Sequence, residues 1–390
     1  MQPRGERRHL RKKWVALTAI IIASITVSGF LLTFRNNYSG ASKSIDFYFG
    51  VEVAYGDFND LKAVVSEVKG YTNTIVLGLP EVSVNRTLLD QSCDYVSSQD
   101  LNFIVLFTNT SQYGWENYTP AQWVQDAIVK YGEKFLAVYR WDEPGGDQID
   151  SSQYKEVKSA RNFQDAAEQY VNMLSPEVAY YHNTGVQVLT ADYGLYYFDY
   201  KAGYDTVLAE FGWNHSREQQ IALARGAAQQ YNRTWGAMIT WTYTEAPHIK
   251  SGGELLADLV LAYDNGAKYV IVFNYPEIET AKYGLLNDEH LAALRKFWNY
   301  SHTYSPTCKT LETAYVLPED FGFGFRSSSD TIWGLWNGDA TATRIFNDVN
   351  VLIQLKGANF DIVYNNSTLV RDSKDHYTEL IYWTGNKVIP

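Results

Sequence analysis

The stretch "FLAVYRWDEPGG", residues 135–146, joins an apolar run to two adjacent acids, a proline and two glycines. A continuous apolar run is typical of a parallel strand that is covered on both faces. Pro144 and the glycines indicate that the chain turns directly afterwards. Asp142 and Glu143 are therefore predicted at the end of a buried strand, beside Trp141. The rest of the chain decides what kind of sheet holds that strand.

Seven more apolar, β-rich runs accompany it, so the candidate strands are 45–53, 74–80, 102–108, 135–141, 186–193, 205–211, 237–243 and 269–275. Helical patterns separate most of them and follow the last, at 57–70, 86–99, 120–133, 162–174, 216–232, 252–266 and 288–302. The link between the fifth and sixth strands is short.

Alternating strands and helices predict an α/β fold with a parallel sheet. Eight units in about 260 residues predict a (β/α)8 TIM barrel over residues 44–305. A doubly wound open sheet would show the same alternation, but the unit count and the absence of a dinucleotide fingerprint favour the barrel. The remaining residues, 306–390, carry a β-α-β-β pattern, with runs at 312–318, 342–357, 360–364 and 379–385. We expect a small C-terminal α/β domain there.

The N-terminus differs from the rest of the chain. Residues 1–13 carry six Lys or Arg and one Glu, and residues 14–34 are 21 residues without a charge. Such a segment is long enough to cross a bilayer, and the basic flank keeps the N-terminus in the cytoplasm. We therefore expect a transmembrane signal-anchor at 14–34, a linker at 35–43 and a barrel outside the cell membrane. A cleaved signal peptide is the alternative, which would make the protein secreted.

Glycosylation sequons agree with an exterior location. They begin at Asn37, Asn85, Asn109, Asn117, Asn214, Asn232, Asn299, Asn365 and Asn366. Together with the anchor they suggest an archaeal or eukaryotic cell surface. The two cysteines, Cys93 and Cys308, would be able to pair in an oxidising compartment. Sequence alone does not show whether they lie near each other.

The composition limits the partners. The chain has a net charge of −11, and beyond the N-terminal tail it has no basic patch of the kind that nucleic acid requires. The seven histidines lack metal-binding spacing, and nothing in the sequence asks for a metal or an organic cofactor. Oligomeric state is left open.

Carboxyl groups stand at or just after most predicted strand ends, where the active site of such a barrel lies. They are Glu52, Glu81, Asp142, Glu143, Asp192, Glu210, Glu245 and Glu277. Glu52 and Glu81 are expected to be solvated. Aromatic residues accompany the acids: Tyr139, Trp141, Tyr193, Trp213, Trp241, Tyr243 and Tyr275. Acids beside rings suit glycoside cleavage, which needs one carboxyl to protonate the leaving oxygen and a second group to stabilise the oxocarbenium-like centre.

From residue 44 to about 305 the chain resembles the glycoside hydrolase superfamily of (β/α)8 barrels. Many of its families carry an Asn-Glu-Pro acid/base motif after strand four, and "WDEP" places Glu143 on that glutamate. The usual nucleophile after strand seven matches Glu245 in "ITWTYTEAP". Asp142 stands where those families have Asn. An Asp-Glu pair also resembles the substrate-assisted hexosaminidases, in which the Asp orients the substrate's own acetamido group.

We therefore expect an extracytoplasmic glycoside hydrolase that acts on a glycan. The candidate catalytic residues are Glu143, Glu245, Asp142 and Glu210. The candidate substrate-binding residues are Trp141, Tyr139, Asp192, Tyr193, Trp213, Trp241 and Tyr243, and Glu210 and Asp192 would position the substrate or tune the pKa of Glu143. The alternative is a catalytically inactive glycan-binding or structural cell-surface barrel.

Overall fold

The computed structural model describes residues 47–107, 118–150, 155–278, 283–306, 311–366 and 377–388, together with residues 153 and 281. Residues Asp46–Pro390 form one compact unit. The predicted tail, anchor and linker lie outside the described residues. Among the helices that are described, none is long and apolar enough to span a bilayer.

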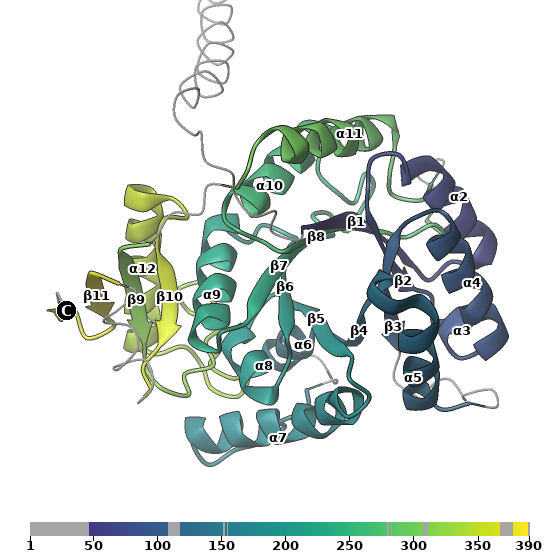
Figure 1. Ribbon diagram of the computed structural model, residues 1–390. Helices are drawn as coiled ribbons and strands as arrows, with labels where there is room; N and C mark the ends of the chain where they lie inside the picture. The colour runs from purple at the N-terminus through teal and green to yellow at the C-terminus, as the bar shows by residue number, and fades with distance from the viewer. Residues whose placement is uncertain are drawn as a thin grey trace, which may run out of the picture. The chain divides into compact units, whose positions relative to one another are not determined.

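The predicted barrel is confirmed. Eight parallel strands close in chain order, β8 pairing with β1, and helices surround them (Figure 1). The strands are β1 (Tyr48–Ala54), β2 (Thr74–Gly78), β3 (Asn102–Phe107), β4 (Phe135–Asp142), β5 (Gln187–Asp192), β6 (Thr206–Phe211), β7 (Thr234–Ile239) and β8 (Tyr269–Asn274).

The α-helices of the barrel are α2 (Phe58–Val68), α3 (Pro80–Ser83), α4 (Arg86–Ser98), α5 (Pro120–Tyr131), α6 (Pro144–Ile149), α7 (Phe163–His182), α8 (Tyr196–Ala202), α9 (Arg217–Gln230), α10 (Gly252–Asp264) and α11 (Asp288–Thr303). Several begin where the sequence offers a side-chain cap. Asp57, Ser251 and Asn287 accept backbone N–H groups of the first turns of α2, α10 and α11. As expected from the short link, the β5–β6 connection holds only the short helix α8.

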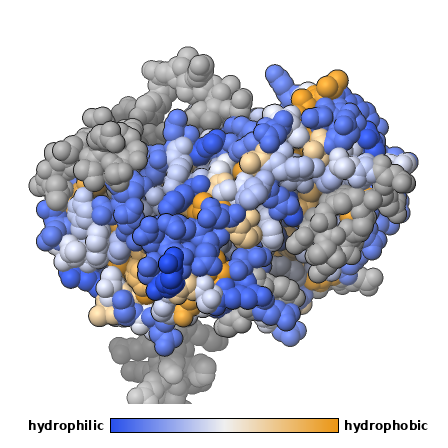
Figure 2. Space-filling model, turned by 90° about the horizontal axis from the view of Figure 1, so that it is seen from below, coloured by the Kyte–Doolittle hydropathy of each residue, from blue (hydrophilic) through white to orange (hydrophobic). Residues whose placement is uncertain are grey.

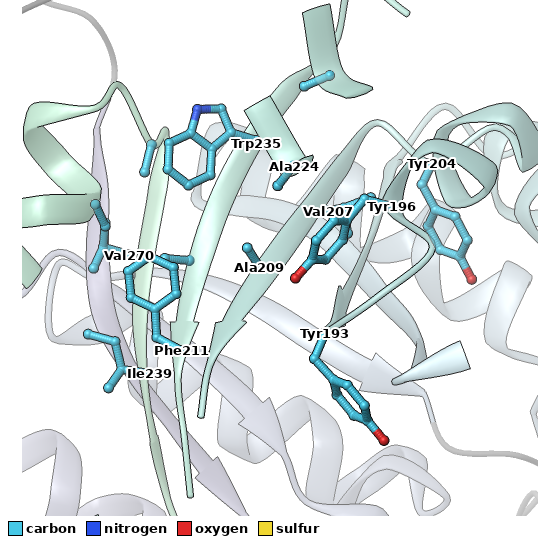
Figure 3. Close-up of a cluster of buried hydrophobic side chains, with 14 of the residues drawn as sticks. Tyr193, Tyr196, Tyr204, Val207, Ala209, Phe211, Ala224, Trp235, Ile239 and Val270 are labelled. Atoms are coloured by element: carbon cyan, nitrogen blue, oxygen red, sulfur yellow. The ribbon is translucent and has the colours of Figure 1, made fainter. Parts of the chain in front are cut away.

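Side chains on each strand alternate between the barrel interior and the surrounding helices. On β6, Val207 and Phe211 point outward into the core that Trp235 of β7 and Ala224 of α9 also enter (Figure 3). Leu208, between them in the alternation, belongs to the separate inner core of the barrel. The same alternation decides which acids enter the barrel.

The seventh strand was predicted three residues too late. It runs over Thr234–Ile239, and not over 237–243. Beyond it, the N–H groups of Thr242 and Tyr243 both donate to the carbonyl of His248, at 2.7 and 2.9 Å. The chain therefore pairs with itself there, and the apolar residues of "ITWTY" continue into a loop.

The C-terminal residues form a second sheet in the order β10-β9-β11-β12, with α12 (Ala340–Lys356) between β9 and β10 in the chain. Its strands are β9 (Thr313–Leu317), β10 (Asp361–Tyr364), β11 (Glu379–Tyr382) and β12 (Lys387–Val388). The small α/β element was predicted, but the two-residue β12 was not.

Helix α9 contacts both the barrel strands and β10 (Figure 1). Arg225 of α9 pairs with the fully buried Asp361 of β10 at 2.8 Å. The segment between β9 and α12 also reaches α6, because Gln148 donates to the Trp333 carbonyl at 2.8 Å and Arg326 to that of Ile149 at 3.0 Å. The second sheet is thus tied to the barrel. Whether 44–305 and 306–390 are separate domains stays a prediction.

On the face shown in Figure 2, hydrophobic residues form small groups in a mainly hydrophilic surface. The sequon residues Asn214, Asn232 and Asn299 are exposed, whereas Asn37, Asn109 and Asn117 lie outside the described residues. Cys93 is fully buried. Cys308 lies outside the described residues, so the pairing of the two cysteines stays untested.

Candidate active site

Three polar side chains enter the barrel because of strand alternation. Glu52 on β1, Tyr139 on β4 and Glu210 on β6 each stand two residues after an inward-facing position. All three are buried, with Glu210 only 4% exposed. Gly78 makes room for Glu52, since a β-carbon there would lie 2.4 Å from Oε1 of Glu52. The carboxyl groups of Glu52 on β1 and Glu210 on β6 are therefore both directed into the barrel interior.

A β-bulge brings Asp142 to the same side as Tyr139. On β4, Tyr139 pairs with Leu189 and Asp142 with Ala191, so three steps on β4 match two on β5. Trp141 takes the extra position, with a φ of 57°. The strand was predicted to end at Trp141, but it continues through Asp142. The Tyr139 hydroxyl donates to the Asp142 carboxyl, which is exposed at the mouth.

Glu143 follows the bulge in a left-handed conformation, with φ 51° and ψ 45°. Its N–H donates to the Ala191 carbonyl of β5 at 3.0 Å. Pro144 then starts α6, as suits the first position of a helix. A left-handed residue with a β-carbon costs about 1–2 kcal/mol, so the surroundings must hold Glu143 there. The Asp-Glu pair consequently shares one pocket despite being adjacent in sequence.

These carboxyl groups strongly influence each other. Burial raises the pKa of Glu143 to about 8, and the negative charge of Asp142 adds to the rise. Burial likewise raises the pKa of Glu210, and the neighbouring Glu143 raises it further. Glu143 and Glu210 also share a hydrogen bond, so the pair holds protons at neutral pH. Oε2 of Glu210 is buried and has no partner within the described residues.

The other two carboxyls complete the cluster. Burial raises the pKa of Glu52, and Asp142 raises it further. Burial raises the pKa of Asp142 as well, but the hydrogen bond from Tyr139 offsets part of that rise. Of the four acids in this cluster, Asp142 is the residue most open to solvent.

An aromatic wall continues the mouth over β1, β8 and the β7 loop. The ring of Tyr55 lies 5.1 Å from that of Tyr275, and Trp241 lies 6.5 Å from Tyr275. Burial raises the pKa of Tyr55 to about 12, and the charges of Asp142 and Glu52 contribute. Tyr55 is nevertheless 48% exposed. Carboxyl groups and open ring faces therefore share one mouth.

The structure places the other predicted aromatic residues differently. Trp141 lies under the Arg140 guanidinium at 5.0 Å, and its indole N–H is buried without a partner in the described part of the chain. Trp213 and Tyr243 are exposed. The N–H of Trp213 donates to the Trp241 carbonyl at 2.5 Å, which joins the β6 and β7 loops.

Glu245 lies in the loop after β7, six positions beyond the strand end, and is exposed. It is not among the groups that shift the pKa of Glu143 most. A carboxyl group that does lie near Glu143 is that of Glu210, on β6, two strands along from β4.

Asp192 and Tyr193 lie behind Glu143, and not on the open side of the mouth. Asp192 is fully buried, and its oxygens accept the N–H groups of Gly145 and Gly146 at 2.6 and 2.8 Å. The Tyr193 hydroxyl donates to Asp150 at 2.9 Å. Both residues were predicted to bind substrate, and in the structure both contact the turn that carries Glu143.

Two residues of the mouth were missed by the sequence reasoning. Glu52 was expected to be solvated but is buried, because it occupies an inward position of β1. The signal was present, since a lone acid between valines in "GVEVA" is rarely buried without a role. Tyr55 had no signal, because its position depends on a left-handed turn with a φ of 61°. In the described residues, no group of His, Cys, Asp and Glu is arranged to hold a metal ion.

No family model matches the sequence, and no curated protein sequence is significantly similar to it. Solved structures do match. An α-L-fucosidase isoenzyme 2 from Paenibacillus thiaminolyticus is 13% identical, with a TM-score of 0.52 over 86% of this chain and 59% of that one. A pneumococcal exo-β-D-N-acetylglucosaminidase module is 10% identical, with a TM-score of 0.45 over 68% and 86%. D-psicose 3-epimerase is 9% identical, with a TM-score of 0.39 over 66% and 99%.

The match to the fucosidase agrees with the (β/α)8 barrel seen in the strand order. At such an identity this match shows the fold alone. The chemistry has to be argued from the mouth itself.

Proposed function

We propose that the protein is a glycoside hydrolase in which Glu143 is the general acid/base. The observation that carries this proposal is the raised pKa of Glu143, about 8, at a mouth that also holds exposed aromatic rings. A glycosidase acid must be protonated at working pH and able to reach the leaving oxygen. An ordinary glutamic acid would already be ionised there.

The proposed reaction begins with a sugar lying against the wall formed by Tyr55, Tyr275 and Trp241. Glu143 gives its proton to the glycosidic oxygen while the bond from the anomeric carbon to that oxygen breaks. Glu210 shares a hydrogen bond with Glu143, so it is suited to hold that proton in place before the transfer. After bond cleavage, the ionised Glu143 takes a proton from the attacking water.

The second group of the reaction is proposed to be Asp142. Its carboxyl is oriented by Tyr139 and opens on the mouth, where it would stabilise positive charge at the sugar or orient an acetamido group. This supports the substrate-assisted route for a 2-acetamido sugar. Glu245 as nucleophile stays a prediction, since it stands in an exposed loop away from the cluster. Burial and the neighbouring Glu143 raise the pKa of Glu210, which disfavours the ionised carboxylate that a nucleophile requires.

The location is proposed from the sequence. An uncharged segment at 14–34 with a basic flank would anchor the chain in the cell membrane with the barrel outside. The exposed sequons at Asn214, Asn232 and Asn299 are compatible with glycosylation on that side. Treatment of the purified native protein with a glycosidase that removes N-linked glycans should reduce its apparent mass.

The test of function is a screen of aryl glycosides and glycan arrays with the wild-type protein beside Glu143→Gln. Turnover of one sugar class that the variant loses would support the proposal. Preference for 2-acetamido over 2-hydroxy sugars would favour the substrate-assisted route. Equal binding by both proteins without turnover would overturn it and point to a glycan-binding barrel.

A further inference from the structure

The Asp192 carboxyl group accepts hydrogen bonds from four backbone N–H groups. Beyond Gly145 and Gly146, it accepts the N–H groups of Tyr193 at 2.7 Å and Gly194 at 3.2 Å. Its side chain is fully buried, so it is not available to a substrate in the mouth. Two of its four donors belong to the turn that follows Glu143.

Further contacts hold the turn of residues 143–146 against the end of β5. The N–H of Glu143 itself donates to Ala191, the residue before Asp192. A β-carbon on Gly145 would lie 2.5 Å from Oδ2 of Asp192, and one on Gly146 would lie 2.3 Å from the Tyr193 ring. The two glycines of "DEPGG" are therefore required by close approach to the end of β5, and not by loop flexibility.

A second acid lies behind Asp192. Tyr170 donates to Asp199 at 2.7 Å, and Asp192 and Asp199 share a hydrogen bond. Burial raises the pKa of Asp192 well above its usual range and the charge of Asp199 adds to the rise, while the N–H groups of Gly145 and Gly146 offset part of it. Burial also raises the pKa of Asp199, to about 7. The two coupled acids therefore share a proton beneath the turn that carries Glu143.

We propose that Asp192 is the positioning residue for Glu143: it clamps the 143–146 turn to the end of β5. The inference rests on the proposed function of Glu143. It revises the expectation that Asp192 contacts the substrate.

The test compares Asp192→Asn with Asp264→Asn in the full-length protein. Asn at 192 keeps the shape but puts an N–H group where the turn needs an acceptor. We expect kcat to fall about 10- to 100-fold, since a small misplacement of a catalytic group is enough for such a loss. KM should stay within about threefold, because substrate contacts are unchanged.

The pH profile separates positioning from general damage. Removal of the carboxyl at 192 should move the basic limb of kcat to lower pH, because Asp192 contributes to the raised pKa of Glu143. Asp264→Asn is the matched control: the Asp264 carboxyl at the end of α10 accepts a hydrogen bond from Tyr300 of α11, so kcat should stay within about threefold and the limb should not move. A raised KM with normal kcat in Asp192→Asn, or equal losses in both variants, would overturn the proposal.

Two measurements test the inference even if no turnover is detected or the Asp192→Asn protein does not fold. Carbon-13 NMR of labelled glutamate, without substrate, should give a lower pKa for Glu143 in Asp192→Asn than in the wild type, and an unchanged value would overturn the clamp. This holds even if no glycoside is cleaved. If Asp192→Asn does not fold, Gly146→Ala displaces the same turn with both acids intact. An unchanged kcat in Gly146→Ala would also overturn the proposal.

Discussion

Replacing Glu143 by glutamine is expected to stabilise the folded protein at neutral pH. In the unfolded chain this carboxyl loses its proton above its ordinary value of 4.5, whereas the folded protein keeps the proton until about pH 8. Between these values the folded state binds more protons than the unfolded state. The free energy of unfolding therefore falls as pH rises from 4.5 to about 8.

The size of the effect follows from the raised pKa of Glu143. Each pH unit in that range lowers the free energy of unfolding by about 1.4 kcal/mol. The wild type is therefore about 3 kcal/mol less stable at pH 7 than at pH 4.5. Glutamine has no proton to retain and removes the carboxyl that also raises the pKa of Glu210. We expect Glu143→Gln to gain up to about 3 kcal/mol at pH 7 but only about 0.4 kcal/mol at pH 4.5, where the glutamate is protonated in the folded state and half protonated in the unfolded state.

The assay is urea unfolding followed by tryptophan fluorescence at the two pH values. Glu133→Gln is the matched control, because Glu133 is exposed on the 3-10 turn before β4 and should change stability by less than about 0.5 kcal/mol. A Glu143→Gln protein that is no more stable than wild type at pH 7 would mean that Glu143 ionises normally. It would then be unsuited to the role of acid.

Three further substitutions test the packing and the mouth. Gly146→Ala should lower the free energy of unfolding by about 1–3 kcal/mol in chemical denaturation, because its β-carbon meets the Tyr193 ring; an unchanged midpoint would contradict the close approach. Arg225→Ala should lower the free energy of unfolding by about 3–5 kcal/mol, because it leaves the Asp361 carboxyl group buried without its cation. Thermal unfolding at the wild-type temperature would argue against a stabilising ion pair between α9 and β10. Trp241→Ala should raise KM about 2- to 10-fold with kcat within about threefold, as expected when a sugar platform is lost; an unaltered KM would exclude Trp241 from the wall.

The barrel could be predicted because each of its strands is a local apolar run and each is followed by a turn or helix signal. The placement of Glu143 after strand four followed directly. The position of Asp142 did not, since the bulge depends on how β4 pairs with β5, a contact between residues about 50 positions apart. The end of β7 was misplaced because "ITWTY" stays apolar after it leaves the sheet. Apolar composition does not distinguish a strand from a loop that turns back on His248.

The structural role of Asp192 was also beyond the sequence. An acid at a strand end reads as a ligand for substrate, and only the approach of Gly145 shows that it binds backbone. The burial of Glu52, in contrast, could have been predicted from the sequence. Its local pattern already indicated an inward position, and the expectation of solvation gave too little weight to strand alternation.

The account's central claim is that Glu143 protonates the leaving oxygen. Its most direct test is the dependence of the rate on the leaving group, measured for wild type and Glu143→Gln on glycosides of the sugar class found in the screen. A dinitrophenyl group leaves without a proton, whereas a phenyl group needs one. We predict that Glu143→Gln loses at least about 100-fold on the phenyl glycoside and much less on the dinitrophenyl glycoside. Equal losses on both, or none on either, would contradict the claim.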